Sequence, residues 1–101
     1  MDKTKIAMSI AGSDSGGGAG IQADLKTFAA LNVYGTCVLT AVTAQNTLEV
    51  SDFEMMSNKL ISSQFNSLIS DIYPNAIKIG MLGSDDVVLL ISELLLSLIH
   101  I

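Results

Sequence analysis

This sequence has little cysteine and little positive charge, and both shortages narrow what the chain can do. Its single cysteine, Cys37, excludes an intrachain disulfide and a metal site built from clustered thiolates. Five Lys and Arg residues against ten Asp and Glu residues give a formal net charge of −5. Since nucleic acids are bound through basic patches, we expect no nucleic-acid partner. The near absence of cysteine fits a reducing, cytoplasmic setting.

Long hydrophobic runs are also missing, although half of the residues are hydrophobic. The longest apolar tract, residues 87–99, contains Glu93 and falls short of the roughly 18 residues that a membrane-spanning helix requires. The apolar run after residue 5 is short and lacks a cleavage-like site, so we expect no signal peptide and no membrane partner. At 101 residues the chain is one domain at most.

What the sequence does contain is a glycine-rich loop between a strand and a helix. Residues 6–11 form an apolar run typical of a strand, and four of the five residues from 16 to 20 are glycine. An apolar stripe at helical spacing follows, made of Ile21, Leu25, Phe28 and Leu31. Glycine lets backbone N–H groups approach a ligand closely, and a helix start adds unpaired donors. The pattern favours a site for a small polar or anionic ligand.

Further strands and helices alternate along the rest of the chain. Residues 36–44 and 76–79 are β-branched or apolar and predict two more strands, while residues 50–56 fit either an extended connection or an edge strand. Ser57 and Ser84 are placed to cap two helices. The stripe of the first of these helices comprises Leu60, Phe65, Leu68 and Ile72. The order predicts an α/β fold with three layers and a mostly parallel sheet.

Three segments follow the predicted strands: residues 12–20, Gln45–Asn46 and residues 80–83. Ligands of open α/β sheets bind beyond the carboxyl ends of the strands. We therefore expect these three segments to share one rim of the sheet.

The glycine loop alone leaves several interpretations open. A nucleotide-binding P-loop is excluded because Lys26 lies too far into the helix to serve it. Gly18-x-Gly20-x-x-Ala23 matches a dinucleotide fingerprint, but the second strand ends without the expected acid. A site for a polar small molecule and a purely structural turn both remain. Asp24, one turn into the helix, is either a ligand contact or a solvated first-turn acid.

Longer blocks of sequence resemble one enzyme family. They are Ala-Gly-Ser-Asp at 11–14, the glycine loop and helix start at 16–27, Tyr-Gly at 34–35, Thr-Ala at 40–41, Ala-Gln-Asn-Thr at 44–47 and Lys-Ile-Gly-Met-Leu at 78–82. Together they resemble the hydroxymethylpyrimidine/phosphomethylpyrimidine kinases of thiamine biosynthesis, which belong to the ribokinase-like superfamily. The resemblance runs from about residue 5 to about residue 95.

The resemblance implies a reaction and a set of binding residues. It implies phosphorylation of 4-amino-5-hydroxymethyl-2-methylpyrimidine and then of its monophosphate, with ATP and Mg²⁺. It places the pyrimidine at Gly12, Asp24, Gln45 and Met81. An amide such as Gln45 offers the donor and acceptor that an aminopyrimidine matches, and the sulfur of Met81 suits an aromatic ring. Without the resemblance, Gln45 would be a turn residue and Met81 a core filler.

The chain also departs from the family pattern. No segment matches the family's anion hole, catalytic residue or nucleotide pocket, so we assign no catalytic residue and expect the ATP and Mg²⁺ sites to be absent. Residues 1–96 are expected to be the amino-terminal part of a kinase domain, and residues 97–101 a non-native tail of a truncated reading frame. Alone, the chain should bind pyrimidine poorly, turn over nothing and be poorly soluble through an open sheet edge. Thr43 stands where the family often has an apolar residue.

Alternative functions remain open at this point. A pyridoxal or pyridoxamine kinase shares the fold and the glycine loop, and a non-catalytic module can bind pyrimidine or pyridoxal without phosphorylating it. A dinucleotide-dependent oxidoreductase is more distant. The resemblance also implies that the complete protein can form a homodimer.

Overall fold

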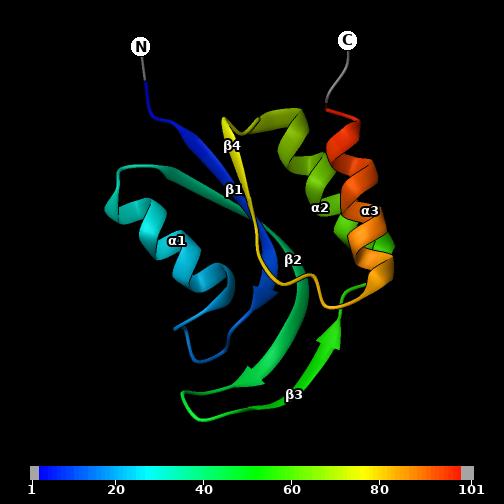
Figure 1. Ribbon diagram of the computed structural model, residues 1–101. Coiled ribbons are helices and arrows are strands. Elements are labelled where there is room, and N and C mark those ends of the chain that lie inside the picture. The colour runs from blue at the N-terminus through cyan, green and yellow to red at the C-terminus, as the bar shows by residue number, and fades with distance from the viewer. Residues whose placement is uncertain (1–2, 99–101) are drawn as a thin grey trace.

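A computed structural model describes residues 3–98, which form a four-stranded sheet flanked by helices (Figure 1). The strands are β1 (Ile6–Ser13), β2 (Tyr34–Gln45), β3 (Val50–Met55) and β4 (Ala76–Ile79). Their order across the sheet is β3-β2-β1-β4. Strand β1 lies parallel to both β2 and β4, whereas β3 is antiparallel to β2. The predicted fold class, α/β with a mostly parallel sheet, is confirmed.

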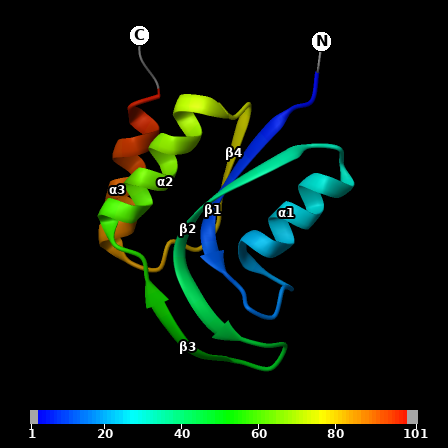
Figure 2. The same cartoon turned by 180° about the vertical axis from the view of Figure 1, so that it is seen from behind.

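The three helices cover both faces of the sheet. Helix α1 (Gly20–Ala30) lies on one face, and α2 (Asn58–Asp71) and α3 (Asp85–Leu96) lie side by side on the other (Figures 1 and 2). The predicted serine caps are confirmed: the Ser57 hydroxyl accepts from the backbone N–H of Leu60, and the Ser84 hydroxyl accepts from that of Val87. Local sequence signals therefore set where α2 and α3 begin.

The sheet differs from the expected one in the segment at residues 50–56. This segment forms β3, an antiparallel edge strand that continues from β2 through a short turn, so the sheet has four strands where three were firmly predicted. Strands β1 and β2 also run further than predicted, to Ser13 and Gln45. The extension carries the end of β2 past the end of β4, beside the glycine loop (Figure 1).

The main core lies between the sheet and the pair α2 and α3. Its buried members are Met8, Ile10, Val38, Ile61, Phe65, Val87 and Ile91. The predicted stripe of α2 is wrong at Leu60, which is 47% exposed, whereas Ile61 is buried. Since Ile61 and Phe65 are four residues apart, they share a helix face that leaves Leu60 toward solvent. The stripe of α1 likewise ends before Leu31, which lies beyond the helix and is exposed.

Three further expectations concern membrane spans, solubility and the end of the chain. Within residues 3–98, no helix has both the length and the apolar character needed to cross a bilayer. Strands β3 and β4 lie at the two edges of the sheet. Because an unpaired strand edge can pair with another chain, low solubility of the chain alone stays a prediction. Of the expected non-native tail at residues 97–101, residues 99–101 lie outside the described residues.

Candidate ligand-binding site

The glycine loop is organised around an internal carboxylate, that of Asp14. Its Oδ1 accepts from the backbone N–H of Gly16 at 2.8 Å, and its Oδ2 accepts from those of Gly18 at 3.0 Å and Ala19 at 2.8 Å. Asp14 is only 6% exposed. The loop thus gives three donors to an anion of the chain itself, and these donors are not free for a ligand. The sequence drew attention to the block that contains Asp14 but did not reveal this role.

Other contacts fix the loop to the start of α1. The Gln22 side chain accepts from the backbone N–H of Asp14 at 2.8 Å and donates to the Ser13 hydroxyl at 2.7 Å. The Lys26 ammonium donates to the Gly17 carbonyl at 2.8 Å, which accounts for this lysine without a phosphate. Gly20 has φ +58°, and a Cβ there would overlap the Gly12 carbonyl oxygen. The loop therefore needs glycine at position 20 and is held in one conformation.

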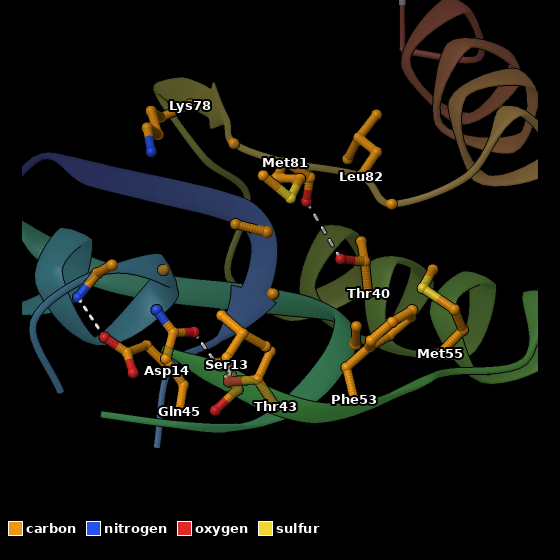
Figure 3. Close-up of a pocket in the computed structure, with 18 residues that line it drawn as sticks. Ser13, Asp14, Thr40, Thr43, Gln45, Phe53, Met55, Lys78, Met81 and Leu82 are labelled. Carbon is orange, nitrogen blue, oxygen red and sulfur yellow. Dashed lines mark hydrogen bonds between the residues drawn. The ribbon is translucent and has the colours of Figure 1, made fainter. Parts of the chain in front are cut away.

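A cavity of about 380 Å³ lies at the carboxyl ends of β1, β2 and β4 (Figure 3). Three segments line it, namely the glycine loop, the end of β2 with β3, and the turn after β4. The three rim segments predicted from the strand ends all contribute to this wall, and β3 adds residues that the strand-end argument did not include. The wall of the cavity is mainly apolar and carries a few polar groups, which is typical of sites for small organic ligands.

Three of the four predicted binding residues line this cavity: Gly12, Gln45 and Met81. Met81 is 83% exposed, so it is not a core filler, and its backbone carbonyl accepts from the Thr40 hydroxyl at 3.4 Å. Phe53, from β3, adds an aromatic ring to the wall and is largely exposed. A thioether and an aromatic ring on one cavity suit a flat heteroaromatic ligand.

Asp24 is placed differently from the other three. Its Oδ2 accepts from the Ser9 hydroxyl at 2.6 Å and from the Lys78 ammonium at 3.0 Å. Asp24 is not among the residues that line the cavity, whereas Lys78 is. The carboxylate thus reaches the cavity through its ion pair, and direct contact of Asp24 with a ligand stays a prediction.

The charge state of Asp24 follows from these contacts. Burial alone would raise the pKa of Asp24, but hydrogen bonds from Ser9 and Lys78, together with the charge of Lys78, outweigh burial and lower the pKa. Asp24 is therefore ionised near neutral pH and holds the Lys78 ammonium at the cavity wall. A lysine within an otherwise apolar strand was the signal that it has a partner.

Two hydroxyl groups tie the end of β2 to its neighbours, that of Thr43 to the end of β1 and that of Ser15 to the glycine loop. Thr43 Oγ1 lies 2.7 Å from the Ser13 carbonyl oxygen and 3.1 Å from Gln45 Oε1. Ser15 Oγ donates to the Gln45 carbonyl and accepts from the Gln45 backbone N–H, both at 2.7 Å. Figure 3 shows Ser13, Thr43 and Gln45 together on one side of the cavity. Both the backbone and the side chain of Gln45 are therefore fixed.

Neither a metal centre nor a reactive thiol emerges from the described part of the chain. Residues 3–98 contain no group of three or more His, Cys, Asp or Glu side chains that could hold a metal ion. Burial raises the pKa of the Cys37 thiol, which favours its protonated form. Among the described residues that line the cavity, Asp14 is the one carboxylate, and its oxygens already accept from three backbone N–H groups, so the lining supplies no free carboxylate for Mg²⁺.

The fold and the position of the cavity define the class of protein. Known structures with this arrangement are ribokinase-like kinases. A crystal structure of phosphomethylpyrimidine kinase from Clostridium difficile superposes with a TM-score of 0.90 at 50% identity, covering 93% of this chain and 41% of that one. Pyridoxal kinase from Staphylococcus aureus, solved with AMP-PCP and pyridoxal, gives a TM-score of 0.84 at 37% identity, with 95% and 36% covered.

The family follows from the sequence comparison. The sequence model of phosphomethylpyrimidine kinase matches residues 14–101, and the chain belongs to this family. Hydroxymethylpyrimidine/phosphomethylpyrimidine kinase from Rhizobium meliloti is 54% identical over 90 residues, which is 89% of this chain and 34% of that protein. The chain thus spans about a third of the length of the curated relatives it matches. The resemblance described from the sequence is confirmed.

Proposed function

We propose that this chain is the pyrimidine-binding part of a kinase that phosphorylates 4-amino-5-hydroxymethyl-2-methylpyrimidine and then its monophosphate. The proposal rests on family membership together with one structural observation. Gln45, the last residue of β2, and Met81, just after β4, line the same cavity beside the glycine loop. An amide that offers a donor and an acceptor, beside a polarizable thioether, is the chemistry that an aminopyrimidine ring requires.

Each proposed contact has a distinct physical task. Gln45 hydrogen-bonds the edge of the ring, Met81 covers its face, and Gly12 lets the ring approach the end of β1. Asp24 contributes through Lys78, whose ammonium brings positive charge to the cavity wall. Such a charge is favourable beside the monophosphate substrate of the second step.

Transfer of the phosphoryl group requires parts that the described residues do not supply. Phosphoryl transfer depends on positioning and on stabilising negative charge at the phosphates, for which kinases use Mg²⁺ and cationic or backbone donors. We propose that the ATP and Mg²⁺ sites and the catalytic residue lie outside these residues, and that residues 1–96 act only within a complete kinase chain. A homodimer and a cytoplasmic location are part of the same proposal.

The experiment therefore uses a chimera, called here the test kinase. In it, residues 5–95 of this chain replace the matching segment of the Clostridium difficile enzyme, whose structure superposes on this one. With ATP and Mg²⁺ we expect phosphorylation of the hydroxymethylpyrimidine, and Gln45→Leu should raise its KM by at least about tenfold. A matched control is Asn66→Leu, which changes an exposed amide on α2 outside the cavity lining. An equal effect of both variants, or turnover unaffected by Gln45→Leu, would contradict the proposal.

A second candidate function is pyridoxal phosphorylation, because the Staphylococcus aureus structure that superposes well is a pyridoxal kinase. Its identity to this chain is 37%, against 54% for the Rhizobium meliloti relative, which favours the pyrimidine. The ratio of kcat/KM for hydroxymethylpyrimidine and pyridoxal in the test kinase decides between them. A ratio below one would make pyridoxal the better substrate.

A further inference from the structure

The Gln45 amide is the part of the cavity best suited to distinguish ligands, and its neighbour Thr43 fixes it. The Thr43 hydroxyl has one proton, and both atoms near its oxygen are acceptors: the Ser13 carbonyl at 2.7 Å and Gln45 Oε1 at 3.1 Å. A hydroxyl proton can be shared between two acceptors, with the shorter contact the stronger. Thr43 thus links the amide of Gln45 to the backbone of β1.

Within residues 3–98, no other hydrogen bond restrains the amide group itself. Ser15 restrains the backbone of Gln45 from the glycine loop, which fixes the position of Cα but not the rotation of the terminal amide. That rotation is broad for a glutamine, and the two orientations exchange the places of Oε1 and Nε2. The Thr43 hydroxyl donates toward Oε1 at 3.1 Å, and the opposite orientation would set the Nε2 donors against the same hydroxyl proton, so this contact favours one orientation over the other.

We propose that Thr43 is a positioning residue that holds the Gln45 amide in one orientation and thereby makes the site select a 4-aminopyrimidine over its 4-oxo analogue. This inference rests on the proposed function, because it assumes that Gln45 contacts the edge of a pyrimidine. The residue was noted in the sequence only because a hydroxyl stands where relatives often carry an apolar side chain. The structure gives that hydroxyl two partners on the cavity wall.

The selectivity follows from the order of donors and acceptors on the ring. A 4-aminopyrimidine presents an N–H donor next to a ring-nitrogen acceptor. The 4-oxo analogue, in its N–H form, presents an oxygen acceptor next to an N–H donor, which is the reverse pair. An amide held in one orientation matches only one of these pairs, whereas a freely rotating amide matches both. Oε1 has two lone pairs, so it can accept from Thr43 and from a ligand amino group together.

The test compares two substitutions at Thr43 in the test kinase. Thr43→Val keeps the size of the side chain but removes the hydroxyl, and Thr43→Ser keeps the hydroxyl. The readout is the ratio of kcat/KM for hydroxymethylpyrimidine to that for its 4-oxo analogue. We expect Thr43→Val to reduce the ratio about tenfold, mainly through KM, since about one hydrogen bond is lost. Thr43→Ser should stay within about twofold of the parent. An unchanged ratio in Thr43→Val would overturn the proposal.

A second measurement does not depend on any substrate. In the ligand-free test kinase labelled with ¹⁵N-glutamine, we expect Gln45 Nε2 to be ordered in the parent and in Thr43→Ser. In Thr43→Val its order parameter should fall toward the flexible range below about 0.6. If neither ring is phosphorylated, the proposed function fails but this spectrum still decides the role of Thr43. A mobile amide in the parent, or an equally ordered one in Thr43→Val, would overturn it.

Discussion

The ammonium of Lys78 on β4 lies 3.0 Å from Asp24 Oδ2 on α1, although 54 residues separate them in the sequence. The same oxygen accepts from the Ser9 hydroxyl of β1. The contact therefore joins a helix on one face of the sheet to two adjacent parallel strands. It also sets the position of the one lysine on the cavity wall.

This relationship predicts how stability depends on pH. The folded pKa of Asp24 lies below its ordinary value of 3.8, so its contribution is present above pH 3.8 and is lost as the pH falls through the folded pKa. In the test kinase, Asp24→Asn should weaken the dependence of the unfolding free energy on pH below about pH 4. It should change the unfolding free energy at pH 7 by less than about 1 kcal/mol. Denaturant unfolding at several pH values measures it. The same pH dependence below pH 4 in parent and variant would show that the Asp24–Lys78 ion pair does not contribute to the unfolding free energy.

The internal carboxylate of the glycine loop gives a larger effect. Asp14→Asn removes a charge that accepts from three backbone N–H groups and replaces one acceptor oxygen with a donor. We expect a loss of about 2–3 kcal/mol in the unfolding free energy of the test kinase and a higher KM for the pyrimidine. The matched control, Asp71→Asn, changes an exposed carboxylate at the end of α2 and should cost less than about 0.5 kcal/mol. An equal loss of unfolding free energy in Asp14→Asn and Asp71→Asn would contradict the role of Asp14 in holding the glycine loop.

Two glycines in the same loop make a matched pair. Gly20 has positive φ and no room for a Cβ beside the Gly12 carbonyl, whereas a Cβ at Gly18 would meet only Asp14 Oδ2 at 3.9 Å. Gly20→Ala should destabilise the test kinase by more than about 2 kcal/mol, since strain adds to overlap. Gly18→Ala should be nearly neutral. Thermal unfolding compares them, and similar melting temperatures for the two variants would contradict the described loop.

A buried hydroxyl in β2 predicts a stabilising substitution. Thr36 is 8% exposed and its Oγ1 has no hydrogen-bond partner within residues 3–98, whereas the Thr40 hydroxyl, on the same face, donates to the Met81 carbonyl. Thr36→Val should stabilise the test kinase by about 1 kcal/mol, because a polar atom without a partner is replaced by a methyl group. Thr40→Val should not stabilise it. Denaturant unfolding would reject the assignment if the two variants changed stability in the same direction.

The parts of the fold that the sequence predicted depend on nearby residues. Ser57 and Ser84 cap helices through contacts three residues away, and the strand at residues 76–79 is an apolar run with turn formers on both sides. The antiparallel pairing of β3 was harder to predict, because its residues alternate poorly and its partner decides its direction. The phase of α2, set by Ile61 in place of Leu60, likewise depends on the sheet that the helix packs against.

The site shows the same division. Gln45 and Met81 were predicted to follow strands, so the strand-end rule placed them on one rim. In the structure Gln45 is the last residue of β2 and Met81 follows β4. Asp14 was not recognised as the anion of the glycine loop, since its three hydrogen bonds depend on the turn geometry of residues 14–19. The partner of Asp24 could not be predicted either, because Lys78 approaches it only when β4 pairs with β1.

The most direct measurement is a crystal structure of the test kinase with 4-amino-5-hydroxymethyl-2-methylpyrimidine bound. The account predicts the ring in the cavity at the ends of β1, β2 and β4, with its amino edge on the Gln45 amide and its face against Met81. A ring bound elsewhere, or one that turns its amino edge away from Gln45, would contradict it.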